Sequence, residues 1–165
     1  MRQPEDDVDR IATAWQRERP DLDVSPLQVL SRVTRLARHL DLARRQSFAA
    51  HDLETWEFDV LAALRRAGPP YSLSPGQLGA ETLVTSGTMT NRIDRLEARD
   101  LVRREPDPND RRGVRVILTD TGRSAVDDAM SDFLTREHSL LASLPDADRA
   151  DLSNLLRVLV QQFGD

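Results

Sequence analysis

Short polar side chains gather at one point of the sequence, directly before a helical pattern. The stretch holds four hydroxyl residues, a glycine and an amide, in the order Thr85, Ser86, Gly87, Thr88, Thr90 and Asn91. Hydroxyls and free backbone N–H groups at a helix N-terminus bond phosphates and base edges, and a terminal amide can bond N6 and N7 of adenine together. The glycine permits close approach. These residue types predict contact with the major groove of double-stranded DNA.

Arginines dominate the region that follows. Eight of the 23 basic residues fall within residues 92–115, beside six carboxylates, although the whole chain carries a net charge of −5. Arg95 lies one turn beyond Asn91 and can reach a guanine or a phosphate. Arg111 and Arg112 stand in the turn-rich string PDPNDRR, from which an arginine can enter a narrow minor groove. A segregated positive face can bind DNA on an acidic protein, because salt screens charges beyond about 10 Å.

Ordinary ion pairs account for some of these arginines equally well. Arg95 and Arg99 can pair with carboxylates on their own helix, such as Asp94. Arg103 and Arg104 are adjacent on a predicted strand, so only one of them can face DNA and the other is expected in solvent. The two arginines of the turn, by contrast, have few purely structural reasons to stand beside a capped helix.

The elements that must position these residues follow from caps, turns and apolar spacing. Ser74 caps a short first helix, and the hydroxyl stretch caps a second helix over residues 86–99. Residues 101–118 alternate apolar and charged side chains around the turn, which predicts the two strands of a hairpin. This order predicts a winged helix-turn-helix, in which the second helix is the recognition helix and the hairpin is the wing.

Long helices are predicted on both sides of this motif. Apolar residues at helical spacing mark residues 5–19, 25–49, 53–67, 120–144 and 146–163. The sequence contains no internal repeat and no long linker, so residues 1–165 are expected to form a single domain that is mainly α with a small β-wing. Residues 53–118 are its winged helix-turn-helix lobe.

Composition excludes several other classes of protein. Hydrophobic residues make up 39% and charged residues 31%, which is typical of a globular chain and not of a disordered one. No apolar run is long enough to cross a membrane and no signal-peptide core is present, so a cytoplasmic location is expected. The chain has no cysteine, which excludes disulfides and thiol-based redox sensing.

The titratable residues do not predict an enzyme. The histidines are His39, His51 and His138, and none takes part in a nucleophile-centred or chelating pattern. We therefore expect no metal site and no cofactor. The stronger alternative is a helical protein-interaction scaffold with a degenerate DNA-binding head. A scaffold would show almost no binding to random duplex DNA, whereas a DNA-binding dimer would bind with a steep salt dependence.

Three strings connect the chain with a known family: SGTMTNRIDRLEARDLV, DPNDRR and LTDTGR. With their spacing they resemble the MarR family of bacterial transcription regulators, and the flanking helices fit the family order over essentially the whole chain. The resemblance implies a homodimer whose dimerisation region is built from residues 5–49 and 120–163. It also implies ligand pockets between that region and each DNA-binding lobe.

The resemblance carries two expectations for the wing. It implies that Asp110 pairs with Arg111 or Arg112 and stiffens the turn. One departure from the family pattern is Asp100, where a glycine usually precedes the Leu-Val of the first wing strand. That position requires a left-handed backbone, which aspartate tolerates less well than glycine.

The helix over residues 5–19, which many members lack, resembles the urate-responsive subgroup of the family, as do Trp15, Asp59 in WEFDVLAAL and Arg92 in TNRIDRL. In that subgroup these positions help to form the pocket that couples the ligand to the recognition helix. Urate is a flat anion that would stack on the indole, pair with the guanidinium and repel the carboxylate. If Asp59 holds Arg92 in the empty protein, the anion would compete for Arg92, move the recognition helix and release the operator.

Each of these three residues also has an ordinary explanation. Trp15 can be core packing, Asp59 can be a surface carboxylate, and Arg92 can contact phosphate without touching a ligand. Phenolic and other aromatic carboxylates, other purines and tricarboxylates suit the same chemistry as urate. The resulting expectation is a homodimeric regulator, most simply a repressor, that a small anionic aromatic ligand releases from a pseudo-palindromic operator.

Overall fold

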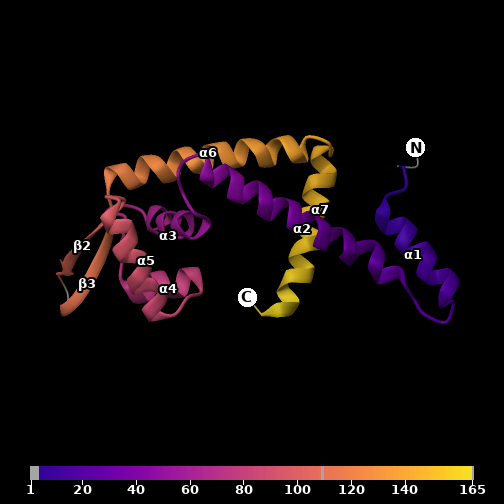
Figure 1. The fold of residues 1–165 in the computed structure, drawn as a ribbon, viewed down its shortest axis with the longest axis horizontal. Coiled ribbons are helices and arrows are strands. Elements are labelled where there is room, and N and C mark those ends of the chain that lie inside the picture. Colours follow the sequence, from indigo (N-terminus) through magenta and orange to yellow (C-terminus); the bar gives the residue numbers. More distant parts are fainter. Residues whose placement is uncertain (1–3, 109, 165) are drawn as a thin grey trace. The chain divides into compact units, whose positions relative to one another are not determined.

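The structure is a computed structural model that describes residues 4–108 and 110–164, without the side chains of Arg111 and Arg112. The described chain is mainly helical with a small three-stranded sheet, so the predicted fold class is confirmed. It separates into two compact units, Met1–Gln46 and Ser47–Asp165. Figure 1 shows the elements with their labels.

The N-terminal unit contains α1 (Asp7–Glu18) and most of α2 (Ser25–Ala49). The α1 helix begins at Asp6, whose carboxylate accepts the Val8 N–H at 2.7 Å and the Asp9 N–H at 3.1 Å. The Asp9 carboxylate accepts the Asp6 N–H in return, which completes a capping box. Val8 and Ala12, one turn apart, are the buried apolar residues of α1.

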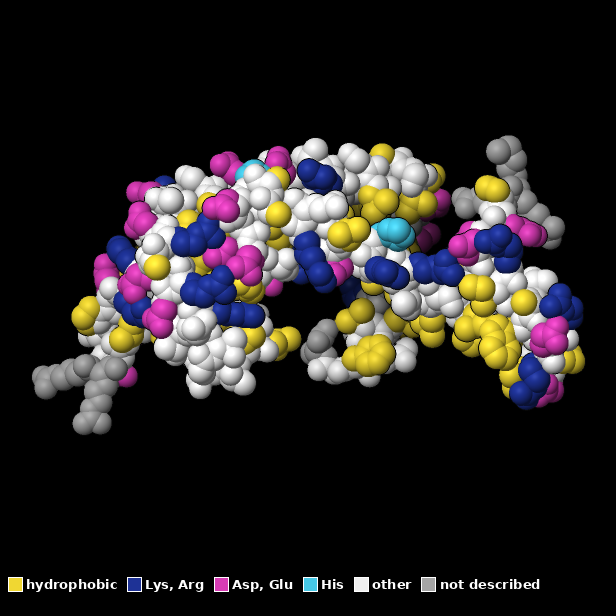
Figure 2. Space-filling view, viewed as in Figure 1, with side chains coloured by type: hydrophobic (Ala, Val, Ile, Leu, Met, Phe, Trp, Pro, Cys, Tyr) yellow, Lys and Arg dark blue, Asp and Glu magenta, His cyan; other side chains and the backbone are white. Residues whose placement is uncertain are grey.

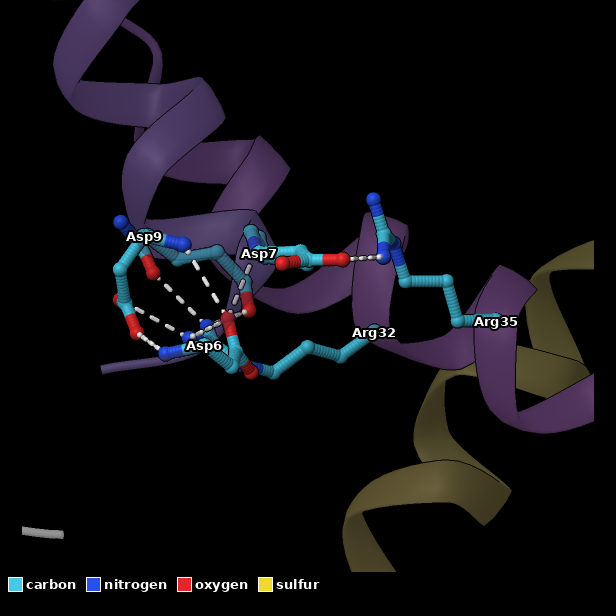
Figure 3. Close-up of polar contacts among 7 residues, drawn as sticks. Asp6, Asp7, Asp9, Arg32 and Arg35 are labelled. Carbon is cyan, nitrogen blue, oxygen red and sulfur yellow. Dashed lines mark hydrogen bonds and ion pairs between the residues drawn. The ribbon is translucent and has the colours of Figure 1, made fainter. Parts of the chain in front are cut away.

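An ion-pair cluster joins the first turn of α1 to α2 (Figure 3). Arg32 reaches Asp6 at 2.8 Å and Asp9 at 2.9 Å, and Arg35 reaches Asp7 at 3.3 Å. The hydrogen bond from Arg32 lowers the pKa of the Asp6 carboxyl below its ordinary value of 3.8. Because this pKa is lowered, the contribution of the Asp6–Arg32 pair is fully present above the ordinary value and is lost only as acid protonates Asp6.

Replacing Arg32 by alanine removes the side chain that holds two of the three aspartates. Amide hydrogens of α1 should then exchange several times faster, because the cluster is solvent-exposed and its pairs contribute modestly. Exchange followed by mass spectrometry measures this, with residues 55–98 as the internal reference. Arg38→Ala, which removes the same charge from α2, serves as the control. Unchanged exchange in α1 of Arg32→Ala would show that the cluster does not hold this helix.

The apolar stripe predicted for the first helix is only partly buried. Ile11 is 42% exposed and Trp15 is 50% exposed, and apolar side chains lie open over α1 in Figure 2. Packing within its own chain therefore does not account for Trp15. The same holds for α2, where Val29, Leu30, Val33, Leu36 and Leu42 are all exposed.

The second unit begins with the last turn of α2 and contains the predicted winged helix-turn-helix lobe. Its elements are α3 (Thr55–Arg66), β1 (Ser72–Leu73), α4 (Pro75–Thr82), α5 (Ser86–Ala98), β2 (Val102–Asp107) and β3 (Asp110–Leu118). The sheet is antiparallel in the order β1-β3-β2, with Ser72 opposite Ile117 and Val102 opposite Leu118. The hairpin of β2 and β3 extends from the lobe as a wing (Figure 1).

The core of this unit lies where α3 meets α4, α5, α6 and the sheet. Phe48 from the end of α2 stacks on Phe58 at a centroid distance of 3.8 Å, and Phe133 lies 5.4 Å from Phe48. Other residues buried in this cluster come from every element of the lobe except β1, and include Leu61, Leu64, Leu78, Met89, Ile93, Leu96, Val102 and Val116. The recognition helix is therefore fixed to the lobe along one face.

Two further helices complete the chain, α6 (Asp120–Leu141) and α7 (Asp146–Val160), followed by a 3-10 turn at Gln161–Phe163. Thr119 caps α6 by accepting the Gly122 N–H at 2.9 Å. No residue of α7 is buried. The apolar side chains of α7 and of the turn, predicted to share one helical pattern, are exposed within this chain: Leu152, Leu155, Leu156, Leu159 and Val160 in α7, and Phe163 in the turn.

The predicted elements agree with the structure to within a few residues at their ends. The helix predicted over 25–49 has those bounds, and the recognition helix ends at Ala98 and not at residue 99. The left-handed backbone expected at Asp100 is confirmed by its φ of 56°. The sequence did not predict β1, because two residues carry no alternating pattern.

Within the described residues, no helix is both long enough and apolar enough to span a membrane.

Candidate nucleic-acid interface

The first helix of the helix-turn-helix has caps at both ends. Ser74 accepts the Gln77 N–H at 3.2 Å, and the Gln77 side chain accepts the Ser74 N–H at 2.8 Å, as predicted for a helix that starts at this serine. Leu83 ends α4 with a left-handed backbone, φ 55°, and its side chain is 92% exposed. The turn that follows leads directly into α5.

The recognition helix buries one face and leaves the other open. Met89, Ile93 and Leu96 point into the core. The residues predicted to contact DNA at its start are exposed, namely Thr85, Ser86, Gly87, Thr88, Thr90 and Asn91. Thr85 is the N-cap and accepts the Thr88 N–H at 3.4 Å. The open face therefore combines small side chains with the positive end of a helix dipole, the arrangement that suits a phosphate backbone.

The wing is held against the recognition helix by Arg104. Its guanidinium forms ion pairs with Asp94 and Glu97 of α5, and its backbone N–H donates to Glu97 at 3.0 Å. The prediction that one of the two adjacent strand arginines lies in solvent fits Arg103, which is exposed and pairs with Glu105. Arg104 therefore has a positioning role that the sequence did not predict, and contact of Arg103 with DNA stays a prediction.

The predicted contacts at the wing tip fall on side chains outside the description. The side chains of Arg111 and Arg112 are not described, and the predicted pairing of Asp110 with one of them therefore lies outside the described residues as well. The backbone of both arginines belongs to β3, which begins at Asp110, so they lie at the start of a strand and not in the turn predicted for them. Their contact with a minor groove stays a prediction.

Arg95 lies on the exposed surface but already has a partner. Its guanidinium donates to Glu54 at 2.6 Å and stacks over the ring of Trp56, 4.6 Å from the centroid. The Trp56 ring N–H also donates to Glu54, and this hydrogen bond, followed by that of Arg95, lowers the pKa of the Glu54 carboxyl. The ion-pair interpretation of Arg95 is thus correct in kind, although its partner lies on the turn before α3 and not on its own helix.

The three predicted ligand residues do not all lie in one unit. Trp15 belongs to the N-terminal unit, whereas Asp59 on α3 and Arg92 on α5 belong to the second, where both are half-buried. Arg92 stacks on Trp56 at 5.3 Å. The structure thus adds a second tryptophan, which contacts the arginine expected to bind the ligand. Trp56 is half-buried, with Arg92 and Arg95 over its ring.

Metal chemistry has no visible support in this part of the chain. Among the residues that the structure describes, no three His, Asp or Glu side chains gather as metal ligands. The chemistry of the site is instead that of hydroxyls, amides, guanidinium groups and an aromatic ring.

A capped helix-turn-helix, an open recognition face and an antiparallel wing define a winged-helix DNA-binding protein. Comparison with known families gives a match of residues 51–113 to the MarR family. A relative that spans nearly the whole chain extends the match beyond these residues. This is the transcriptional regulator PecS of Dickeya dadantii, 36% identical over 150 residues, which are 91% of this chain and 90% of PecS. The chain belongs to the MarR family.

Two other comparisons agree with this assignment. The transcriptional repressor NicR of Pseudomonas putida is 32% identical over 144 residues, covering 84% of this chain and 89% of NicR. The structure of BpsR from Bordetella bronchiseptica, solved to explain regulation of its DNA binding by 6-hydroxynicotinic acid, superposes with a TM-score of 0.65. It is 30% identical and covers 80% of this chain and 92% of BpsR. The protein is therefore a DNA-binding transcription regulator and not an enzyme.

Proposed function

We propose that the protein is a homodimeric repressor that a small anionic aromatic ligand releases from a pseudo-palindromic operator. The observation that carries the proposal is the open N-terminal face of α5, where small hydroxyl residues surround Gly87. This face can approach a phosphate backbone and place Asn91 at base edges. Repression is favoured by the similarity to NicR, which is named as a repressor.

The dimer is supported by apolar surface that a single chain leaves uncovered. No residue of α7 is buried, and α2 exposes five large apolar side chains. Apolar side chains also lie open over α7 in Figure 2. Large exposed apolar patches on a folded protein mark an interaction surface. We assign residues 5–49 and 120–163 to the dimerisation region and residues 53–118 to the DNA-binding lobe.

The ligand class is supported by the chemistry around Arg92. This half-buried guanidinium stands on the recognition helix and stacks on the indole of Trp56. A flat anion could pair with the guanidinium and compete with it for the face of the indole. The related BpsR is regulated by 6-hydroxynicotinic acid, an aromatic carboxylic acid. Urate and aromatic carboxylates are therefore the first candidates, and both are flat anions.

The test is a titration of the protein with the duplex upstream of its own gene, with and without urate or 6-hydroxynicotinate. We expect specific binding that a ligand weakens, a steep loss of affinity with salt, and a footprint of two half-sites roughly 10 bp apart. A single asymmetric half-site would contradict the dimeric repressor. Almost no binding to random duplex DNA at low salt would favour a protein-interaction scaffold.

Asp59→Ala tests the coupling between ligand and DNA. We expect the displacement of this carboxylate by the anion to be what moves the recognition helix. Without the carboxylate, the variant should bind operator normally but need a higher ligand concentration for release, by about tenfold for a coupling of about 1.4 kcal/mol. Half-release concentrations from the same titration measure this. Asp127→Ala, an aspartate of α6, is the matched charge control. Unchanged release in Asp59→Ala would remove Asp59 from the mechanism.

A further inference from the structure

Glu57 is the only buried carboxylate among the residues that the structure describes. It lies in the first turn of α3 and is 2% exposed. One of its oxygens accepts two hydrogen bonds, from the Glu54 N–H at 2.9 Å and from the Arg99 guanidinium at 2.7 Å. Burial of an unpaired carboxylate is very unfavourable, whereas a paired and hydrogen-bonded one is tolerated. Arg99 is therefore held to Glu57 more firmly than an exposed ion pair would hold it.

The same guanidinium also binds the segment before α3. Its second amino group donates to the backbone carbonyl of Asp52 at 2.7 Å and to the Asp52 carboxylate at 2.8 Å. Because a guanidinium is a rigid planar fork, contacts on both of its arms fix its orientation as well as its position. Arg99 is the C-cap residue of α5. The buried contact thus fixes the C-terminal end of the recognition helix.

Two more arginines of α5 reach the same short segment. Arg92 and Arg95 stack on Trp56, and Arg95 pairs with Glu54. With Arg99 they stand at i, i+3 and i+7, which is one face of a helix. The Arg95–Glu54 pair is more than half exposed on both sides, so it contributes little by itself. The buried pair of Arg99 with Glu57 is therefore the contact that can fix the position of α5 relative to this segment.

We propose that the segment Asp52–Glu57 is a platform that sets the pose of the recognition helix, and that Glu57 is its positioning residue. The inference rests on DNA reading by α5, as proposed above. Base recognition depends on where the helix places its side chains, whereas contacts to phosphate tolerate small displacements. Loss of the platform should therefore lower affinity for the preferred sequence and leave affinity for other duplex DNA unchanged.

The experiment compares three variants of the full-length protein. Glu57→Gln keeps an oxygen that can accept the Glu54 N–H but removes the charge that holds Arg99. Glu57→Gln combined with Arg99→Met removes both charges, and removing a whole buried pair costs far less stability than breaking one. Glu81→Gln on α4 is the matched control, because it deletes the same charge from an exposed ion pair with Arg66 of α3 in the same lobe.

The probes are a duplex selected by the wild-type protein from a random-sequence pool and a random duplex of equal length. We expect both Glu57 variants to bind the selected duplex about tenfold more weakly, the loss equivalent to one good base contact. Binding to the random duplex and the dependence of affinity on salt should not change. Denaturation of each variant, followed by circular dichroism, measures its stability. The double variant should recover the stability that Glu57→Gln loses, while its preference for the selected duplex stays reduced.

Several results would overturn the proposal. Wild-type affinity of Glu57→Gln for the selected duplex would do so, as would a loss in Glu81→Gln of the same size. Equal losses on both duplexes, with a smaller salt dependence, would make Arg99 a phosphate contact. Recovery of sequence preference together with stability in the double variant would make the pair purely structural. If the wild-type protein selects no sequence at all, the proposed function fails, and the platform fails with it.

Discussion

Replacing Gly122 by alanine is expected to destabilise the DNA-binding lobe strongly. A Cβ atom at this position would lie 2.0 Å from the carbonyl oxygen of Leu101 and 2.9 Å from the side chain of Leu118. The obstacle is backbone, because the Leu101 carbonyl accepts the Thr119 N–H at 3.2 Å where α6 begins. A clash of this kind should cost about 3 kcal/mol or more, a large part of the roughly 5–15 kcal/mol that stabilises a domain.

Thermal denaturation followed by circular dichroism measures the effect as a lowered melting midpoint, and DNA binding should be lost at the same lowered temperature. Gly76→Ala is the control, since its Cβ atom would meet only the Ser74 hydroxyl at an ordinary 3.9 Å. We expect the midpoint of the control to stay close to wild type. A wild-type midpoint for Gly122→Ala would show that the junction of α5, β2 and α6 can shift at little cost.

Replacing Gly87 by alanine should have the opposite outcome: the fold is kept and DNA binding is weakened. A Cβ atom at Gly87 meets nothing within 4 Å in the protein, and this position has no left-handed backbone to preserve. Alanine should therefore leave stability unchanged or raise it by up to about 1 kcal/mol. On the open face of α5, however, the added methyl group would separate the helix from the DNA backbone and displace its base contacts.

We expect a loss of DNA affinity of about tenfold to a hundredfold, the size of one or two displaced contacts. Affinity and unfolding free energy measured on the same preparation separate the two effects. Thr82→Ala is a useful control, because Thr82 lies in the same motif but its hydroxyl is bonded to the carbonyl of Leu78 within α4. Wild-type DNA affinity in Gly87→Ala would show that this part of α5 does not approach DNA closely.

Much of the fold could be predicted from local sequence. Ser74 and Thr85 are strong N-cap residues, and both start the helices predicted from them. The alternation in residues 101–118 correctly gave the wing, and Asp100 takes the left-handed backbone that its position requires. These features depend on neighbours within a few residues, which one sequence is sufficient to reveal.

The partners of charged side chains could not be predicted in the same way. Arg95 and Arg99 were considered as partners of carboxylates on their own helix, but they bind Glu54 and Glu57, some forty residues earlier in the chain. Nothing in helical spacing distinguishes a carboxylate one turn away from one on another helix. The sequence does show, from the spacing of Arg92, Arg95 and Arg99, that these three arginines lie on one face of the helix.

Burial of apolar residues was predicted less well on α1. Periodicity shows that Trp15 belongs to an apolar stripe, but it does not show what covers the stripe. The structure buries Val8 and Ala12 and leaves Trp15 half exposed. A periodic pattern of this kind predicts that a helix forms, but it does not predict which surface packs against the helix.

The two-residue strand β1 has a consequence for how the lobe folds. Ser72 and Leu73 pair with Ile117 and Val116, and the Leu118 N–H donates to the carbonyl of Tyr71 at 3.0 Å. The whole helix-turn-helix is therefore enclosed between segments that meet only when the wing is complete. Closing this long loop has an entropic cost that is recovered only when β3 arrives, so helices and wing should form and melt as a single cooperative step. A nascent chain that stops before Val116 would lack a stable DNA-reading head.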